Sequence, residues 1–206
     1  MYRVAPDDEL STAGREYAER LRRLDRSTWR RVLNVQAPYR WNIRRLGLGR
    51  TLDVGCGLGR NLAHLGGNGV GVDHNPTSIA IARSRGLTAF TGEEFRASEY
   101  AKPSSFDSIL FAHVAEHLSL ETGLELLREY LAYLRPGGKV CFITPQERGY
   151  RTDATHIRFV DFDGIREMTD ALGLREVRHF SFPFPRIIGR VFPYNEFVLL
   201  AAQPSP

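Results

Sequence analysis

A glycine-rich turn directly after an acidic residue is the feature whose residue types and spacing most clearly imply chemistry. Residues 51–61 read TLDVGCGLGRN, an apolar run that passes through Asp53 into a turn with Gly55, Gly57 and Gly59. Glycine allows a positive φ and a close approach to a ligand where a Cβ would collide, and the next helix begins with unpaired N–H groups. The turn therefore predicts a small-molecule pocket. The carboxylate of Asp53 favours a ligand with a cationic group over a pyrophosphate.

The spacing of these glycines differs from the dinucleotide fingerprint G-x-G-x-x-G, because Arg60 stands where the third glycine would be. The turn at Pro136-Gly137-Gly138 also disfavours an NAD-dependent oxidoreductase. Further along, Asp73 ends a second apolar run, and a carboxylate at such a place can accept hydrogen bonds from both hydroxyls of a ribose. Asp73 is thus a candidate ribose ligand.

A second group of reactive side chains follows the apolar run 106–112. His113, Glu116 and His117 share one face if this segment opens a helix, by the i, i+3, i+4 rule. The segment DATH, which ends at His156, follows a later apolar run. Ligand chemistry in a parallel sheet concentrates beyond the carboxyl ends of its strands, so both segments are expected at one rim.

The elements that position these residues are indicated by apolar runs that alternate with helical patterns. Asn75 before Pro76 marks a helix start, and Gly173 marks a helix end. The alternation indicates a parallel sheet with helices on both faces, preceded by N-terminal helices. We expect strands over 50–55, 69–73, 87–91, 106–112, 138–144, 174–181 and 195–202, and helices over 7–34, 38–47, 59–65, 76–85, 121–134 and 162–172.

The arrangement D-V-G-C-G-x-G resembles motif I of the class I S-adenosylmethionine (SAM) methyltransferases. Further landmarks follow in that family's order: Asp73, the strand 88–91 with the acids after it, and the segments 106–112 and 134–143. The resemblance implies a Rossmann-like, doubly wound α/β sheet of seven strands, mostly parallel, with an antiparallel last strand. It also implies one domain over 1–206, with a helical cap at 1–47, a SAM-binding core at 48–145 and a substrate side at 146–206.

The resemblance implies which residues contact SAM, or its product S-adenosylhomocysteine. One of the acids Glu93 and Glu94 would read the adenine amino group. Other roles stay open, because Asp53 could cap a helix, Asp73 could start a turn, and the two glutamates could be a solvated pair. The implied cofactor residues are Asp53, Gly55, Cys56, Gly57, Gly59, Asp73, His74, Glu93, Glu94, Ala112 and His113.

The segment 113–118 is similar to the E-x-x-E-H segment of two O-methyltransferase families, those of ubiquinone biosynthesis and those that modify small RNAs. In these families, acids and histidine bind a divalent metal that chelates the substrate hydroxyl; His113 replaces the first glutamate here. Glu116, His117 and His156 are therefore candidate ligands for Mg²⁺ or a similar metal, or catalytic groups with a histidine as base. Purely structural roles, such as a helix cap or a loop histidine, stay open.

The segment 180–197 is rich in aromatic residues and prolines. Arg186, Tyr194 and Asn195, together with Asp153, are candidate substrate residues, although the segment could equally cover a sheet edge or form a dimer contact. Amine methyltransferases that act on bases and glutamine often have an N-P-P-Y or D-P-P-Y tetrapeptide after the fourth strand. This chain has no such tetrapeptide there, which favours an oxygen acceptor. The whole pattern resembles small actinobacterial sugar O-methyltransferases, among them those of methylmannose polysaccharide synthesis, and implies a saccharide acceptor.

Composition is consistent with one cytoplasmic enzyme domain. The chain has 206 residues, 42% hydrophobic content and a net charge of +4, with no apolar run of membrane-spanning length and no signal peptide. The two cysteines lack metal-site spacing. The arginine-rich first part of the chain could bind nucleic acid, as an RNA 2′-O-methyltransferase would. Its pattern more strongly indicates an amphipathic helix whose solvated face is rich in arginine. A quinone or phenol O-methyltransferase and a SAM-binding module without activity also remain open as functions.

Overall fold

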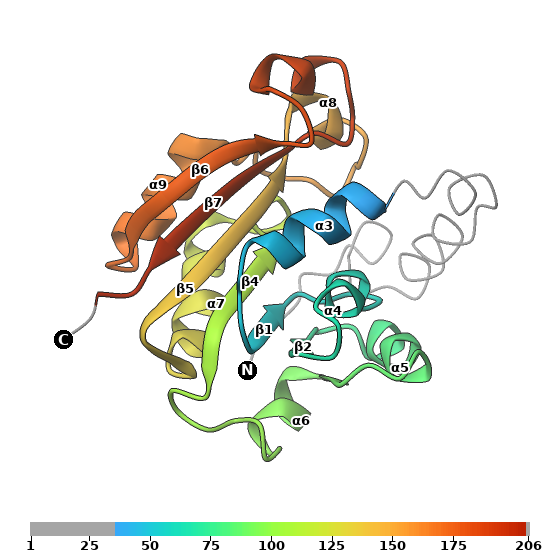
Figure 1. Ribbon diagram of the computed structural model, residues 1–206, viewed down its shortest axis with the longest axis vertical. Coiled ribbons are helices and arrows are strands. Elements are labelled where there is room, and N and C mark those ends of the chain that lie inside the picture. The colour runs from blue at the N-terminus through green and yellow to red at the C-terminus, as the bar shows by residue number, and fades with distance from the viewer. Residues whose placement is uncertain (1–35, 205–206) are drawn as a thin grey trace.

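The computed structural model describes residues 36–204, and its centre is a seven-stranded sheet in the order β3-β2-β1-β4-β5-β7-β6 (Figure 1). Strands β1 to β5 pair in parallel, whereas β7 runs antiparallel to both β5 and β6. This arrangement confirms the predicted, mostly parallel sheet with an antiparallel last strand. The strands are β1 (Thr51–Val54), β2 (Gly69–Val72), β3 (Ala89–Phe90), β4 (Phe106–Ala112), β5 (Leu134–Pro145), β6 (Arg175–Phe182) and β7 (Glu196–Ala202).

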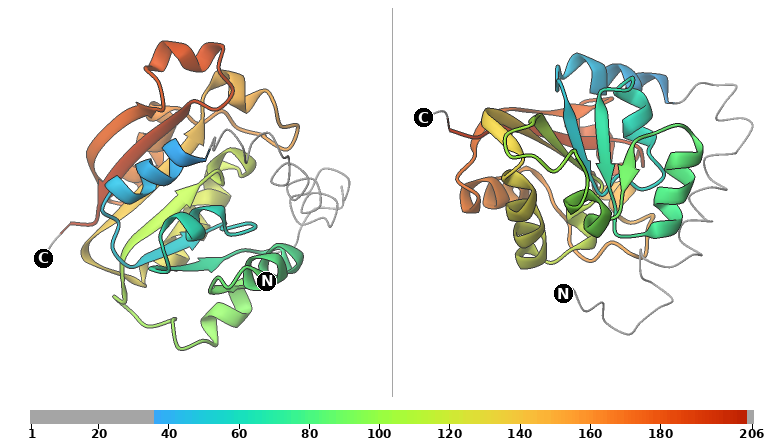
Figure 2. Two further views of the ribbon diagram at one scale, coloured as in Figure 1. Left: turned by 45° about the vertical axis from the view of Figure 1, so that its right-hand side comes forward. Right: turned by 90° about the horizontal axis from the view of Figure 1, so that it is seen from below.

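Helices cover both faces of this sheet (Figure 2). On one face lie α3, α4 and α5, and on the other lie α6, α7 and α9. Side chains of β4 alternate between the two cores, with Ile109 and Phe111 on the α7 side and Leu110 and Ala112 on the α3 side. The helices are α3 (Ala37–Arg45), α4 (Arg60–His64), α5 (Pro76–Ser84), α6 (Gly92–Arg96), α7 (Leu120–Leu131), α8 (Glu147–Tyr150) and α9 (Phe162–Ala171), with 3₁₀ turns η1 (Ala115–His117) and η2 (Arg186–Arg190).

The helix starts follow the local sequence. The side chain of Asn75 accepts hydrogen bonds from the backbone at the start of α5, and Ser119 and Asp161 do the same for α7 and α9. These caps fix the helix starts close to the carboxyl ends of the strands. No helix in the described part of the chain is long and apolar enough to cross a membrane.

Several predicted elements differ from the observed ones. The expected helix over 7–34 lies outside the described residues. The segment after β4 does not open an α-helix, because His113 has a φ of 58° and only the 3₁₀ turn η1 follows. The loop expected after residue 145 contains α8. Strand β3 is short because Thr91 already caps α6, a helix that the sequence pattern did not predict.

Candidate functional site

The glycine turn after β1 combines tight packing with an open position. Gly55, Gly57 and Gly59 all have positive φ values, of 78°, 53° and 79°. A Cβ on Gly55 would collide with Val114, and one on Gly59 would collide with Leu87. A Cβ on Gly57 would meet no atom of the described chain within 4 Å. The outer two glycines are therefore required by packing, and the middle one leaves room for a close approach.

Asp73, at the end of β2, closes this turn. One of its carboxylate oxygens accepts the backbone N–H of Gly57 at 2.8 Å, and the other accepts that of Asn75 at 2.8 Å. The next residue, His74, is largely exposed, with Nδ1 3.5 Å from the Asp73 carboxylate. Asp73 thus lies beside the open glycine position, where the sequence predicts a ribose.

Asp53 is a buried acid at the same rim. Its side chain is 1% exposed, and neither carboxylate oxygen has a hydrogen-bond partner within residues 36–204. Burial, followed by the negative charge of Asp73, raises the pKa of Asp53 to about 7, although Arg60 acts in the opposite direction. Burial also raises the pKa of the Cys56 thiol. The carboxylate therefore gains from a donor or cation placed above the turn, whereas Cys56 is a packed thiol.

The two acids after β3, Glu93 and Glu94, differ in their hydrogen-bond partners. Glu94 completes a capping box with Thr91 and makes a bidentate ion pair with Arg83, at 2.7 and 3.2 Å. Hydrogen bonding to Arg83, above all, lowers the pKa of Glu94. Glu93 is exposed in the first turn of α6. Of the pair, Glu93 has the side chain that is not engaged in the cap.

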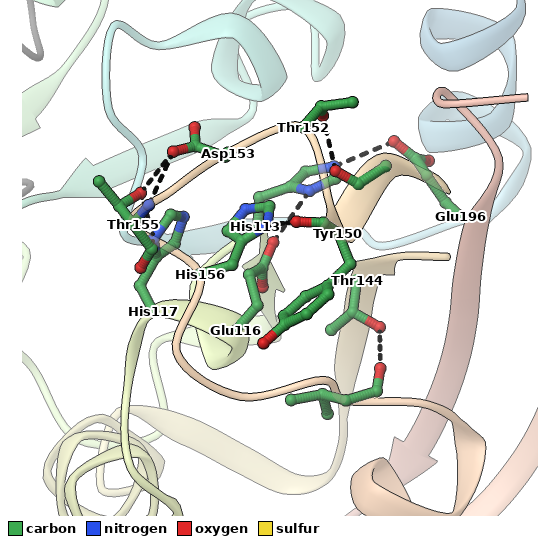
Figure 3. A network of polar contacts seen from close by, with 12 residues as sticks. His113, Glu116, His117, Thr144, Tyr150, Thr152, Asp153, Thr155, His156 and Glu196 are labelled. Carbon is green, nitrogen blue, oxygen red and sulfur yellow. Dashed lines mark hydrogen bonds and ion pairs between the residues drawn. The ribbon is translucent and has the colours of Figure 1, made fainter. Parts of the chain in front are cut away.

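A second part of the candidate site surrounds His113, which directly follows β4 (Figure 3). Its backbone N–H donates to Ile143 of β5 at 2.8 Å. Its ring lies between two carboxylates, with Nδ1 3.2 Å from Glu116 and Nε2 3.0 Å from Glu196. Burial lowers the pKa of His113, but the hydrogen bonds and charges of the two glutamates outweigh burial and raise the pKa to about 9. The two carboxylates therefore favour the protonated form of this ring.

Glu116, His117 and His156 come together as predicted, with one potential ligand atom of each within 4.8 Å of the others (Figure 3). The two imidazole rings meet edge to face, with centroids 4.8 Å apart. Glu116 is 0% exposed, and its Oε2 has no hydrogen-bond partner in the described part of the chain. Its backbone carbonyl accepts the N–H of Ile157 at 2.8 Å, which ties η1 to the loop that carries His156.

Neighbouring groups fix the tautomers of both histidines. His156 Nδ1 lies 2.7 Å from the carbonyl oxygen of Tyr150, and His117 Nδ1 lies 3.2 Å from that of Thr155. Because a carbonyl only accepts, each Nδ1 carries the hydrogen and each neutral ring has its lone pair on Nε2. Thr155 also donates its hydroxyl to Asp153 at 2.8 Å. Burial is the main cause that lowers the pKa of His117, so this ring favours the neutral state.

The remaining substrate candidates lie next to α8 and β7. Arg186 makes a bidentate ion pair with Glu147 of α8. Asn195 is fully buried, and its side-chain amide donates to Gln146 at 2.9 Å, so in this conformation it supports the chain rather than facing solvent. Tyr194 is 46% exposed. Asp153 faces Thr155 through an Asx turn and so acts on His117 indirectly.

Glu196 carries no signal in the sequence pattern, and Thr155 is marked only by its place in the segment DATH. Glu196 enters through the pairing of β7 with β5, where it lies opposite Pro145. Thr155 joins through its hydrogen bonds to His117. A cavity beside His113 opens between α3, α4 and the ends of β4, β5 and β7. Its lining residues are Tyr39, Asn42, Ile43, Arg60, Asn61, Ala112, His113, Ile143 and Glu196.

Comparison with known proteins gives one family and several relatives. A family model described as a methyltransferase domain matches residues 17–186. A ubiquinone biosynthesis O-methyltransferase of Xanthomonas oryzae pv. oryzae is 30% identical over 103 residues, which cover 46% of this chain and 42% of that protein. The protein of the same name from Azorhizobium caulinodans is 38% identical over 86 residues, covering 38% of this chain and 34% of that protein. The chain thus matches less than half the length of these relatives.

Solved structures share the fold. A SAM-dependent methyltransferase from Archaeoglobus fulgidus superposes with a TM-score of 0.63 at 19% identity, covering 80% of this chain and 93% of that one. The N-methyltransferase NodS from Bradyrhizobium japonicum WM9 superposes with a TM-score of 0.60 at 19% identity, covering 81% and 95%. At this identity the likeness concerns the fold.

Proposed function

This chain belongs to the methyltransferase domain family, as a class I SAM-dependent methyltransferase, and on that premise we propose that it transfers the methyl group of SAM to a hydroxyl of a small molecule. SAM would lie over the glycine turn, with its ribose at Asp73 and its cationic end near Asp53. The open position at Gly57 and the unpartnered, buried carboxylate of Asp53 within the described residues support this placement.

The main support for an oxygen acceptor is the cluster of Glu116, His117 and His156. Methyl transfer from a sulfonium is an in-line displacement that needs an aligned acceptor, and an alcohol or phenol must also lose its proton. Three groups that bind protons or cations converge within 4.8 Å at the rim next to the expected cofactor. This arrangement fits activation of a hydroxyl.

The donor set fits a divalent cation. Glu116 offers its Oε2, which has no hydrogen-bond partner among the described residues, and each histidine offers an Nε2 lone pair that is fixed by a backbone carbonyl on Nδ1. Glu116, His117 and His156 would hold the cation, which would lower the pKa of the acceptor hydroxyl. Without a cation, His156 is the base in this proposal, because its Nε2 is fixed as a proton acceptor.

An aromatic hydroxyl is the acceptor class that we favour. The relatives named for ubiquinone biosynthesis support a quinol or phenol more than a saccharide. The loop that carries His156 also exposes large apolar side chains, with Ile157 65% and Phe159 38% exposed. Such side chains suit an apolar acceptor. A saccharide hydroxyl is the second candidate, because the exposed ring of Tyr194 could stack on a sugar.

Incubation with labelled SAM and matched acceptors tests the proposal. The acceptor panel contains catechols, simple phenols and small oligosaccharides, each with a chelator and with added Mg²⁺ or Mn²⁺. A labelled O-methyl catechol that disappears with chelator supports the aromatic acceptor and the cation. Chelator-resistant product supports His156 as base. SAM binding without product on any acceptor would indicate a binding module and contradict the proposal.

A further inference from the structure

We propose that Glu196 is a positioning residue of this site: through His113 it holds one oxygen of Glu116 in place and leaves the other available to the acceptor site. The inference rests on the proposed function for its effect on catalysis. The hydrogen-bonded chain Glu196–His113–Glu116 is a separate property that can be measured without activity. No part of the sequence pattern assigns a role to Glu196.

The chain consists of two hydrogen bonds through one imidazole (Figure 3). Nε2 of His113 lies 3.0 Å from Glu196 Oε1, and Nδ1 lies 3.2 Å from Glu116 Oε1. The ring of His113 therefore bridges the two carboxylates, one at each nitrogen. Glu116 is therefore held by Oε1 alone, and its Oε2 stays without a partner among residues 36–204.

Glu196 and His113, the first two members of the chain, are held by the sheet. Glu196 lies opposite Pro145 in the antiparallel pair of β5 and β7, and its carbonyl accepts the side-chain amide of Gln146 at 3.0 Å. His113 has a left-handed φ of 58°, which residues other than glycine adopt uncommonly, although histidine does so more often than most. The ring is thus placed between the two carboxylates by the backbone, so Glu116 is aimed from outside its own turn.

Burial explains why Glu116 needs such a partner. A carboxylate that is 0% exposed is costly to keep charged unless a cation or donors lie against it. The ring of His113 supplies a hydrogen-bond partner for Glu116 at 3.2 Å, and Glu196, with 8% exposure, holds that ring at its other nitrogen. Groups that orient a ligand or catalytic carboxylate in this way typically change metal affinity or activity about 10- to 100-fold when removed.

The test uses Glu196→Gln, which keeps the shape and removes the charge. We expect Mn²⁺ affinity, followed by electron paramagnetic resonance, and kcat with the best acceptor to fall by about 10- to 100-fold. Binding of S-adenosylhomocysteine should fall by less than either quantity, because Asp53, Gly57 and Asp73 are separate from this chain and His113 is the one expected cofactor residue that belongs to it. The matched control is Glu176→Gln, which removes an acid bound to His179 on the outer strand β6 and should change neither quantity.

A spectroscopic arm decides the inference independently of the proposed function. Nitrogen-15 spectra of the wild type should show at least one exchange-protected ring N–H signal for His113, and Glu196→Gln should shift the ring-nitrogen signals. If the wild type binds no Mn²⁺ and makes no O-methyl product, the proposed function fails while these spectra still support or refute the chain. A folded Glu196→Gln protein with unchanged ring signals, Mn²⁺ affinity and kcat would overturn the role of Glu196.

Discussion

The two halves of the candidate site lie along one edge of the same sheet and are built from different materials. At the ends of β1 and β2, the backbone does the shaping, through three glycines with positive φ and N–H groups that hold Asp73. At the ends of β4, β5 and β7, side chains hold one another, as in the chain Glu116–His113–Glu196. One half comes from a contiguous stretch, and the other is assembled from segments far apart in the sequence.

The two halves should therefore be sensitive to different substitutions. A backbone pocket depends on the space above it, so an added side chain should do more harm than a lost one. A side-chain cluster depends on each member, so a lost group should be felt by the others.

The largest effect is expected from Gly57→Val in the backbone half. The new side chain would occupy the open position above the turn and would strain the backbone at its φ of 53°, so binding of S-adenosylhomocysteine should be abolished in calorimetry, with the overall fold retained by circular dichroism. Gly59→Val is the matched comparison, because its Cβ would collide with Leu87 and should lower the melting temperature as well. Normal binding by Gly57→Val would mean that the turn does not face the ligand.

In the side-chain half, His156→Ala should lower kcat about a hundredfold, since a base or cation ligand is lost. Glu116→Gln should do the same, and the double variant should be little worse than either single one, as for residues that act as a unit. Initial rates with the best acceptor give these values, and cofactor affinity should change little. Near-native turnover by His156→Ala, or full additivity of the two losses, would separate His156 from the cluster.

Asp73→Ala tests a side chain that holds the backbone half of the site in place. It removes acceptors for Gly57 and Asn75 and the expected partner of the ribose. We expect binding of S-adenosylhomocysteine to weaken by about 1.5–3 kcal/mol, the scale of hydrogen bonds to a charged group. Calorimetry that gives an unchanged affinity would remove Asp73 from the ribose position.

The backbone half was readable from the sequence because its information is local. The apolar run, the glycines and Asp73 lie in a short stretch, and the strand and helix alternation places them at one edge of the sheet. The roles of Glu93 and Glu94 were less readable, because an acid after a threonine suits both a capping box and a ligand contact. In the structure Glu94 takes the first of these roles and forms the capping box with Thr91.

The side-chain half was readable only in part. Two chemical types, imidazole and carboxylate, pointed to Glu116, His117 and His156, whose proximity is confirmed. Glu196 gave no sequence signal, since its place depends on the register between β5 and β7. The left-handed backbone at His113 was equally hidden, because histidine adopts it uncommonly, although more often than most residues. Long-range pairing and an uncommon backbone conformation are what sequence patterns omit.

The smallest effect concerns a histidine behind the backbone half. His64, on α4, is 6% exposed, and its Nδ1 has no hydrogen-bond partner within the described residues, unlike the paired rings of the side-chain half. Burial, followed by the positive charge of Arg60 and other arginines, lowers the pKa of His64 to about 4. The unfolded chain, with a histidine pKa of about 6.5, therefore binds the proton more readily than the folded one.

Stability should consequently fall as the pH drops from about 6.5 towards 4, because protonation favours the unfolded state in this window. The loss due to His64 is about 1–2 kcal/mol at pH 5 relative to pH 7.5. His64→Leu should remove this part of the acid sensitivity, measured by urea unfolding at the two pH values, whereas the exposed His179→Gln should leave most of it. A His64→Leu protein that loses as much stability as the wild type at pH 5 would show that the buried ring is not the acid-sensitive group behind the turn.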